Sequence, residues 1–456
     1  MKFSEYEWPC EYDAPLKSQV QTTLFLLQNP RGFVLNEMGT GKTLSALWAT
    51  DILFRNKKIK RVLITTVLST VHSVWVLHLF KNFPRAKYSV LTGSKKEKLS
   101  QLSKDVEYYI INHDGLKNVE QELIAKNFDI VIIDELTAFK TYNNDRSKCC
   151  KRITDRSKSV WGMTGNPTPN NPTEAFGQAK VVNPKNVHLP TYFSKFRYMV
   201  MRQIDEYTWI PLDGHEFEVE KILQPSIRYT RDECVDLPPC TIPDITVVPM
   251  HKEQSTVYKA LKDEYIHSMK AGDITAGNAA AKAVKLLQVS SGVVYDDEKR
   301  HIRLACSPKL NALWDLWLNV NNKKLIVFVA FTGTIAMIED FFTKKKVSHR
   351  KIDGSVKPAD RAKYIDEFQT KDLEILIIQP AAASHGITLT AANTACWYTP
   401  VTSGEICQQA NARITRPGQK HKQLIARLSC SEVETAAYKA LERKEKLGAV
   451  ILKLFE

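Results

Sequence analysis

Short apolar runs alternate with longer polar or amphipathic stretches along most of the chain. In the first half, the strand-like runs lie at residues 32–36, 61–66, 108–112, 129–134 and 160–165. In the second half, comparable runs lie at residues 324–331, 349–354, 374–380 and 394–400. Strands that alternate with helices are typical of parallel sheets covered by helices. The pattern therefore predicts an α/β fold that contains two such sheets.

A different kind of sequence separates the two series of strands. Residues 225–245 contain four prolines and indicate a linker, and residues 250–290 are rich in Ala, Lys and Gln and indicate helix. We therefore expect an N-terminal lobe at residues 1–235, a Pro-rich linker with a helical segment at 236–305, and a C-terminal lobe at 306–456. The prolines make the linker a candidate hinge.

Composition excludes several classes of protein. Of 456 residues, 43% are hydrophobic and 25% are charged, which argues against a disordered chain or a fibrous repeat. No apolar run is long enough to span a membrane. The nine cysteines are scattered and lack zinc-site spacing, which favours a reducing cytoplasm over a disulfide framework. The net charge of +14 is compatible with a polyanionic partner but also with simple solubility.

A phosphate-binding loop is expected directly after the first strand. The string NEMGTGKT at residues 36–43 leads from that strand into a helical pattern, so backbone N–H groups and a helix N-terminus would face a phosphate. Lys42 would reach the β- and γ-phosphates, and the Thr43 hydroxyl would hold Mg²⁺. The strict pattern has Gly at position 36, where this chain has Asn36. The expected nucleotide contacts are Met38, Gly39, Thr40, Gly41, Lys42 and Thr43.

Two neighbouring carboxylates end the strand at residues 129–134. Asp134 and Glu135 would lie at the ligand-binding edge of a parallel sheet. Asp134 would hold Mg²⁺ through water, and Glu135 would orient and deprotonate the attacking water. Acidic residues in the first turn of a helix are the alternative interpretation, which the phosphate loop upstream disfavours.

Taken together, these strings resemble helicase superfamily 2, and within it the Swi/Snf-type DNA translocases. In the first half, residues 63–75 resemble motif Ia of that family, residues 131–140 its acidic box, and residues 163–176 its motif III. The resemblance implies two RecA-like lobes with an ATP cleft between them, Mg²⁺, and movement on DNA driven by ATP hydrolysis. It also implies an adenine-contacting glutamine, for which Gln19 is favoured over Gln21.

The second half carries the more specific part of the resemblance. Residues 382–394 resemble motif V, and QQANARITRPGQ at 408–419 matches motif VI at each of its fixed positions. The family assigns the motif VI arginines to the γ-phosphate, with Arg416 as the finger and Arg413 as its partner. Their three-residue spacing predicts one face of a helix. Gly386 and Gln409 are further nucleotide contacts that the resemblance implies.

The same resemblance implies a grip on the phosphodiester backbone, without sequence specificity. The candidate hydroxyl contacts are Thr66, Ser69, Thr332 and Ser384, and turn or cap roles are the alternative for each. DNA is the expected partner, with replication or recombination proteins as further candidates. We expect the chain to act as a monomer in the cytoplasm of a bacterium or of a phage-infected host.

Departures from the family pattern leave alternatives open. The fourth residue of the acidic signature that begins at Asp134 is Thr137 instead of His, which affects the expected coupling to motif III more than hydrolysis. Motif V retains one glycine of its loop, and Gln379 and Pro380 precede it. The alternatives are an RNA-directed ATPase, or a nucleic-acid-binding module whose ATPase activity has decayed.

Overall fold

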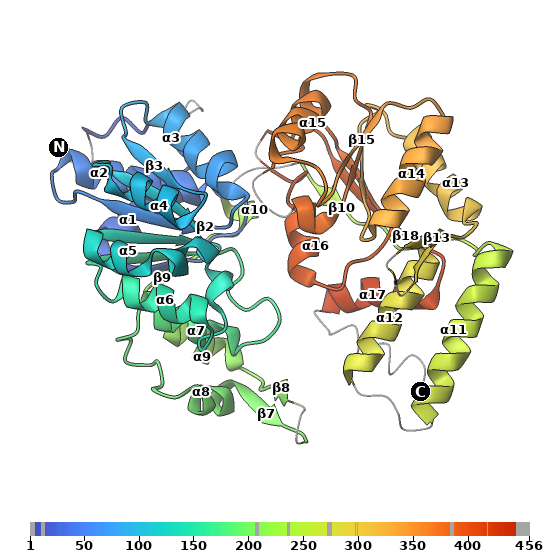
Figure 1. Cartoon of the computed structure of the whole chain (residues 1–456), viewed down its shortest axis with the longest axis horizontal. Helices are drawn as coiled ribbons and strands as arrows, with labels where there is room; N and C mark the ends of the chain where they lie inside the picture. Colours follow the sequence, from blue (N-terminus) through green and yellow to red (C-terminus); the bar gives the residue numbers. More distant parts are fainter. Residues whose placement is uncertain are drawn as a thin grey trace. The chain divides into compact units, whose positions relative to one another are not determined.

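The computed structural model describes residues 5–10, 14–205, 209–234, 238–270, 276–296, 298, 300–383, 387–416 and 418–443. The chain divides into two compact units, residues 1–236 and 237–456, which we call lobe one and lobe two. Each lobe contains a sheet of parallel strands with helices on both faces (Figure 1). This confirms the predicted α/β fold with two parallel sheets.

Lobe one is built on a seven-stranded sheet in the order β3-β4-β2-β5-β6-β1-β9. All neighbouring strands in it are parallel. The strands are β1 (Arg31–Val34), β2 (Val62–Thr66), β3 (Tyr88–Leu91), β4 (Tyr108–Asn112), β5 (Ile130–Asp134), β6 (Ser159–Met163) and β9 (Ser226–Ile227). Since the strands are parallel, their carboxyl ends share one edge, and the phosphate loop and the acidic box both begin there.

Alternating residues of these strands pack against two different layers of helices. In β5, Ile130 and Ile132 face one hydrophobic cluster, whereas Val131 and Ile133 face the other. The first cluster includes residues of α1 (Lys17–Gln28), α2 (Lys42–Arg55) and α3 (Leu77–Asn82). The second includes residues of α4 (Lys95–Ser103), α5 (Glu120–Lys126), α6 (Asp145–Thr154), α7 (Glu174–Val182), α8 (Phe193–Val200) and α9 (His215–Ile222). Burial on both faces explains why these strands are continuous apolar runs in the sequence.

Lobe two contains a second parallel sheet in the order β10-β18-β17-β14-β16-β15, with β11 also paired to β18. Its strands are β10 (Cys240–Thr241), β11 (Thr246–Val247), β14 (Leu325–Phe328), β15 (His349–Ile352), β16 (Ile375–Ile378), β17 (Thr394–Trp397) and β18 (Gln423–Ser429). Its flanking helices are α13 (Ser307–Leu318), α14 (Thr332–Lys344), α15 (Pro358–Thr370) and α16 (Gly404–Asn411).

The helical segment predicted before the second lobe packs within lobe two. It forms α11 (Lys252–Lys270) and α12 (Ala276–Ser290), which share a hydrophobic cluster with α17 (Glu432–Arg443). A buried ion pair joins Lys309 of α13 to Glu434 of α17 beside this cluster. Two small antiparallel pairs lie outside these two sheets, β7 (Met201–Gln203) with β8 (Trp209–Pro211), and β12 (Val293–Tyr295) with β13 (His301–Arg303).

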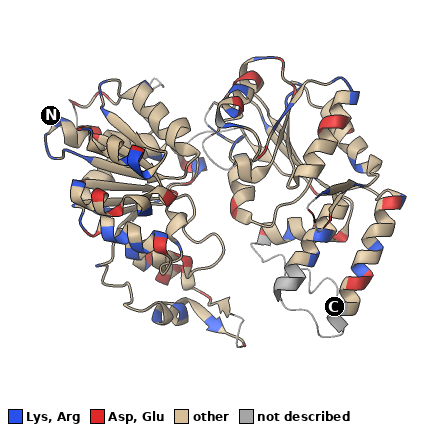
Figure 2. Ribbon diagram, in the orientation of Figure 1, with Lys and Arg blue, Asp and Glu red and all other residues tan. Residues whose placement is uncertain are grey.

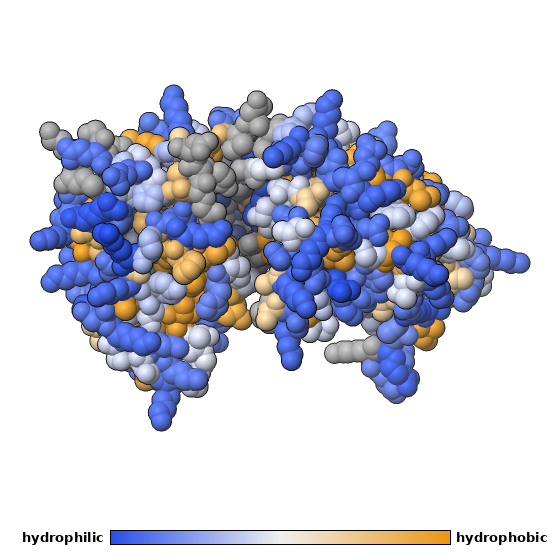
Figure 3. Space-filling model, turned by 90° about the horizontal axis from the view of Figure 1, so that it is seen from above, coloured by the Kyte–Doolittle hydropathy of each residue, from blue (hydrophilic) through white to orange (hydrophobic). Residues whose placement is uncertain are grey.

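Hydrophilic residues cover most of the face seen from above, with hydrophobic residues scattered among them (Figure 3). Among the helices that the structure describes, none combines the length and the apolar character that crossing a bilayer requires. Lys and Arg residues lie on helices of both lobes together with Asp and Glu residues (Figure 2).

Candidate functional site

The phosphate loop connects β1 to α2 as the sequence predicts. Gly41 has a left-handed backbone, with φ at 79°, and lies directly before the first residue of α2. The Lys42 ammonium donates hydrogen bonds to the carbonyl oxygens of Asn36 and Glu37, at 2.6 and 2.9 Å. The Thr40 hydroxyl donates to the same Glu37 carbonyl at 2.8 Å. The loop thus folds around the Lys42 ammonium, whose hydrogen bonds go to loop carbonyls. When a nucleotide binds, phosphate oxygens would replace these carbonyls as acceptors.

Gln19 lies against this loop, whereas Gln21 is exposed. A Cβ atom placed on Gly41 would lie only 2.0 Å from the Gln19 side-chain nitrogen. The side-chain oxygen of Gln19 accepts a hydrogen bond from the Leu16 backbone N–H at 2.9 Å. Of the two glutamines that the sequence left open, Gln19 is therefore the one that the fold places at the loop.

Asn36 explains why the loop departs from the strict glycine pattern. Its buried side chain donates to the Thr22 hydroxyl at 2.9 Å and accepts from the Tyr229 backbone N–H at 3.0 Å. Thr22 belongs to α1, and Tyr229 follows β9 at the end of lobe one. Asn36 therefore ties the beginning of the loop to two distant segments, which glycine could not do.

The Asp134 carboxylate lies at the end of β5 and accepts hydrogen bonds from two side chains of the same lobe. The Trp75 indole nitrogen and the Thr66 hydroxyl both donate to Asp134 Oδ2, at 2.8 and 3.0 Å. Burial raises the pKa of Asp134, while these two donors and the charge of Lys42 act in the opposite direction. β1 and β5 both pair with β6 in parallel, so the phosphate loop and the acidic box follow strands that end at the same edge of the sheet.

Glu135 follows with an unusual backbone conformation. Its φ of 51° places it in the left-handed region, which is uncommon for residues other than glycine. The chain then enters a short 3₁₀ turn, Leu136–Phe139, that contains the buried Thr137. The strained backbone at Glu135 is typical of functional sites. It is consistent with the predicted role in orienting water, which stays a prediction.

A separate contact joins the acidic box to the motif III segment. Lys140, three residues after Thr137, forms an ion pair with Glu174 at 3.1 Å. The Glu174 carboxylate also accepts hydrogen bonds from the backbone and side chain of Asn170, at 3.1 and 2.9 Å. Motif III also approaches the phosphate loop, since a Cβ atom on Gly165 would lie 3.3 Å from the Met38 backbone nitrogen. A link between box and motif III therefore exists that does not use position 137.

The motif VI arginines do not lie on a helix, contrary to the spacing argument. Helix α16 ends at Asn411, and Arg413 and Arg416 follow it in turns. The reason is local, because Pro417 has no N–H to donate to the Arg413 carbonyl and disfavours a helical backbone at Arg416; the Arg413 carbonyl accepts a hydrogen bond from the Leu389 N–H at 3.0 Å instead. Arg413 is buried and donates to the Ile387 carbonyl at 3.4 Å, whereas the half-buried Arg416 donates to the Thr388 hydroxyl at 3.2 Å. Both arginines are thus anchored to the middle of the motif V segment, at residues 387–388.

The remaining nucleotide candidates of lobe two have different outcomes. The Gln409 side chain is buried and donates to Glu405 at 3.3 Å, within its own helix. Gly386, a predicted nucleotide contact, and Ser384, a predicted nucleic-acid contact, lie outside the described residues. The structure therefore places Gln409 but adds nothing on the other two predictions.

The candidate nucleic-acid contacts differ in their exposure to solvent. Thr66 is fully buried and donates to Asp134, so its hydroxyl does not face a phosphodiester backbone as expected; it supports the carboxylate instead. Ser69 and Thr332 are exposed, and the Thr332 hydroxyl contacts the Tyr295 hydroxyl at 3.2 Å. Trp75, which donates to the same Asp134 carboxylate, is a site residue that the sequence analysis did not name. The end of motif Ia was the signal that could have pointed to it.

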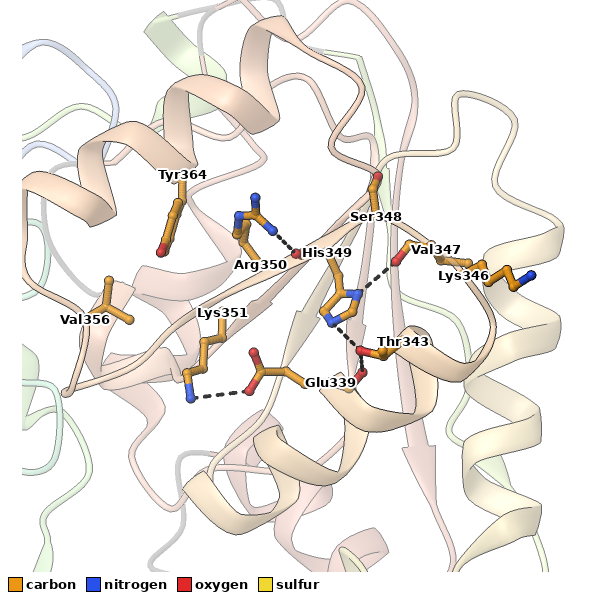
Figure 4. A pocket seen from close by; sticks show the side chains of 10 residues that line it. All are labelled: Glu339, Thr343, Lys346, Val347, Ser348, His349, Arg350, Lys351, Val356 and Tyr364. Carbon is orange, nitrogen blue, oxygen red and sulfur yellow. Dashed lines mark hydrogen bonds and ion pairs between the residues drawn. The ribbon is translucent and has the colours of Figure 1, made fainter.

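One hollow in lobe two lies apart from these residues (Figure 4). Its volume is about 500 Å³, and it is lined by edge strand β15 and by parts of α14 and α15. Lys351 points across it to Glu339 at 3.3 Å, and Arg350 pairs with Glu367 at 3.6 Å. Since these charges already have protein partners, the hollow is not assigned a ligand.

Two family models match the chain. A model described as "SNF2-related domain" covers residues 17–297, and one described as "Helicase conserved C-terminal domain" covers residues 308–418. Among curated proteins, the chromatin remodeling factor mit1 of Schizosaccharomyces pombe is 24% identical over 432 residues, which are 86% of this chain and 29% of mit1. A SWI/SNF-related regulator of chromatin from Drosophila melanogaster is also 24% identical, over 86% of this chain and 50% of its own length. The chain thus spans half or less of the length of these two relatives.

A phage protein is closer to this chain in extent. Putative protein p41 of Acyrthosiphon pisum secondary endosymbiont phage 1 is 24% identical over 383 residues, which are 80% of either chain. Among solved structures, a Sulfolobus solfataricus SWI2/SNF2 ATPase core in complex with dsDNA is 18% identical, with a TM-score of 0.47. That comparison covers 92% of this chain and 89% of the other.

Proposed function

The chain belongs to the SNF2-related family and is an ATP-hydrolysing enzyme of helicase superfamily 2, and we propose that it uses ATP hydrolysis to move along duplex DNA. The proposal does not require strand separation. The observation that carries it is the convergence, at one sheet edge of lobe one, of the phosphate loop with Lys42 and of the supported Asp134 carboxylate.

The residues of this edge fit a Mg²⁺–ATP complex. The Thr43 hydroxyl and the Asp134 carboxylate supply the oxygen ligands that Mg²⁺ prefers. When bound, Mg²⁺ neutralises charge on the β- and γ-phosphates. Lys42 would exchange its loop carbonyls for phosphate oxygens, and the raised pKa of Asp134 would fall as a cation replaces lost solvation. Glu135 would orient and deprotonate the attacking water.

Lobe two would contribute the groups that stabilise the transferring phosphoryl group. We assign Arg416 as the finger because it is half-buried, and Arg413 as its partner because it is buried and bonded to Ile387. An arginine finger contributes about 10³–10⁵ in rate in related NTPases. Because the nucleotide site and the arginines belong to different lobes, hydrolysis would depend on how the lobes close, which is the basis for movement.

DNA would be held through its backbone by exposed hydroxyl groups, with Ser69 in lobe one and Thr332 in lobe two as the remaining described candidates. Such contacts carry affinity without sequence specificity, and they weaken as salt increases. Relatives named as chromatin remodelling factors support duplex DNA as the partner. Replication or recombination partners and a cytoplasmic location stay predictions.

The first experiment measures ATP hydrolysis with no nucleic acid, duplex DNA, single-stranded DNA or RNA, at about 50 and about 200 mM salt. We expect duplex DNA to stimulate hydrolysis most, and more so at the lower salt concentration. Stimulation by RNA alone would contradict the DNA assignment. ATP binding without hydrolysis under every condition would indicate the decayed module.

A matched pair of lysine variants tests the site. Lys42→Ala removes the charge expected on the phosphates and should lower hydrolysis at least about 100-fold. Lys58→Ala removes an exposed lysine of the same lobe and should leave hydrolysis unchanged. Movement itself is tested by displacement of a third strand from a DNA triplex, which should require ATP and Lys42. Hydrolysis that persists in Lys42→Ala would show that the site assignment is wrong.

A further inference from the structure

The indole of Trp75 forms a direct link between a surface segment and the metal-binding carboxylate. Trp75 is fully buried, and its nitrogen donates to Asp134 Oδ2 at 2.8 Å. Thr66 donates to the same oxygen at 3.0 Å. Both donors belong to one continuous stretch, residues 66–76, that begins at the end of β2. The two bonds therefore fix Asp134 relative to this stretch and not only to its own strand.

The local geometry of this stretch is unusual. Residues Val71–Val76 form a π-helical turn, closed by a hydrogen bond from the Leu77 N–H to the His72 carbonyl five residues earlier. Turns of this type are rare and are often found at functional sites. The turn buries the Trp75 ring beside the sheet, while His72 and Ser73 on the same turn remain exposed.

The outer side of the stretch is suited to contact a phosphodiester backbone. Ser69, His72 and Ser73 are all exposed there, and the Ser73 hydroxyl donates to the Ser69 carbonyl at 2.6 Å. Ser69 and Ser73 are thus bonded to each other, and His72 and Ser73 lie on the same turn as the indole. Trp75 lies two residues after Ser73 on the same turn, so a ligand that shifts the backbone of this turn also shifts the indole N–H that bonds Asp134.

We propose that Trp75 is a positioning residue that couples DNA on the outer face of residues 69–73 to Mg²⁺ binding at Asp134. The proposal rests on the proposed function, since it presumes that this face contacts DNA. DNA bound there would set the direction of the indole N–H and so the orientation of the carboxylate. Because such coupling is reciprocal, DNA should tighten Mg²⁺–nucleotide binding by the same factor by which Mg²⁺–nucleotide tightens DNA binding.

The test uses the full chain and a non-hydrolysable fluorescent ATP analogue. The Mg²⁺ concentration that gives half-maximal nucleotide binding is measured without and with saturating duplex DNA. In the unmodified protein we expect DNA to lower this concentration at least about fivefold. In Trp75→Phe, which keeps an aromatic ring but deletes the N–H, the ratio should fall to about one. Direct titration with duplex DNA in the absence of nucleotide should show that the variant still binds DNA.

Trp161→Phe is the matched control. Trp161 is also buried in lobe one, and its indole nitrogen donates to the Asn29 carbonyl at 3.1 Å, away from Asp134. This variant should keep the ratio of the unmodified protein. A Trp75→Phe protein that keeps the full ratio would overturn the proposal, and so would an equal loss in Trp161→Phe, which would indicate general loosening of the core.

A second variant covers the case in which Trp75→Phe does not fold. Thr66→Val keeps the shape of the side chain and removes the other donor to Asp134 Oδ2, so it should lower the ratio in part. An unchanged ratio in Thr66→Val would then overturn the proposal. Failure of the proposed function is distinct, since the unmodified protein would then neither bind duplex DNA nor be stimulated by it. A protein that duplex DNA stimulates, but whose Mg²⁺ dependence DNA does not alter, refutes the coupling alone.

Discussion

Restoring glycine at position 36 should weaken the protein, although glycine is what the strict phosphate-loop pattern requires. The Asn36 side chain bonds the Thr22 hydroxyl at 2.9 Å and the Tyr229 N–H at 3.0 Å. Asn36→Ala removes both bonds, and Asn36→Gly removes them and also adds freedom to the unfolded chain. A buried polar group left without its partner costs about 1–3 kcal/mol.

The partners decide where in that range each loss falls. The Thr22 hydroxyl still donates to the Ser18 carbonyl at 2.7 Å, and the Tyr229 backbone is only half-buried, so both losses lie toward the lower end. We therefore expect Asn36→Ala to destabilise lobe one by about 2–4 kcal/mol. Asn36→Gly should add about 0.5–1 kcal/mol. At about 2–4 °C per kcal/mol for a unit of this size, the Ala variant should unfold about 5–15 °C lower.

Asn36→Asp distinguishes hydrogen bonding from shape. The Thr22 hydrogen is already donated to the Ser18 carbonyl, so an aspartate would place an oxygen acceptor against an oxygen that has no proton to give. Despite its similar shape, Asp should therefore be no better than Ala. Asn29→Ala, which removes one local bond to the Phe25 carbonyl at a helix end, serves as the control and should cost about 1 kcal/mol or less.

Thermal unfolding and nucleotide binding measure these effects together. Each variant is unfolded as the full chain, and the transition of lobe one is identified by its shift when nucleotide is added. The Ala and Gly variants should also bind ATP more weakly, because Asn36 is the first residue of the loop and its carbonyl holds Lys42. A Gly variant that is as stable as the unmodified protein and binds ATP equally well would refute the reasoning.

Two further predictions concern one residue in each lobe. Gly41→Ala should abolish tight ATP binding. The left-handed backbone at this position would carry about 1–2 kcal/mol of strain in alanine, and the new Cβ would lie 2.0 Å from the Gln19 side-chain nitrogen. Unchanged affinity in a nucleotide titration would contradict this prediction. Lys309→Met should destabilise lobe two by about 3–5 kcal/mol, because it leaves Glu434 buried and unpaired. Burial already raises the pKa of Glu434, so protonation stabilises the fold as pH falls through that pKa, and the deficit should be smaller in unfolding at pH about 5 than at about 8.

The parts of the molecule that could be predicted are those that local sequence determines. Buried parallel strands need apolar side chains on both faces, so β2, β5 and β14 are recognisable as continuous apolar runs. The phosphate loop and the acidic box follow such strands directly, and parallel pairing brings both to one edge. Short edge strands such as β3, Tyr88–Leu91, carry too little pattern to be distinguished from loop.

Two predictions failed for different physical reasons. The spacing of Arg413 and Arg416 fits a helix, but Pro417 supplies no N–H to the Arg413 carbonyl, which accepts a hydrogen bond from the Leu389 N–H instead. Thr66 is a small hydroxyl residue of the kind expected to contact a phosphodiester backbone. However, its strand β2 pairs with β5, and the Thr66 hydroxyl donates to Asp134 at the end of β5. At Thr66 a tertiary contact outweighs a local preference, whereas at the two arginines the proline that follows them is a local signal against helix that the spacing argument left out.

The bonds around position 36 also connect the phosphate loop to the end of lobe one. The Leu35 and Glu37 N–H groups donate to the carbonyls of Ile227 and Tyr229, at 2.8 and 2.9 Å. The Glu37 carboxylate accepts from the Arg231 N–H at 3.1 Å, and Asn36 binds Tyr229 through its side chain. The Lys42 ammonium donates hydrogen bonds to the carbonyls of the same two residues, Asn36 and Glu37. A bound phosphate that takes over Lys42 would break these two bonds. It would therefore change the contacts of the segment to which residues 227–231 are hydrogen-bonded. Glycine at position 36 would keep the phosphate loop but remove the side-chain hydrogen bonds to Thr22 and Tyr229. We therefore expect Asn36→Gly to weaken ATP binding as well as to lower stability.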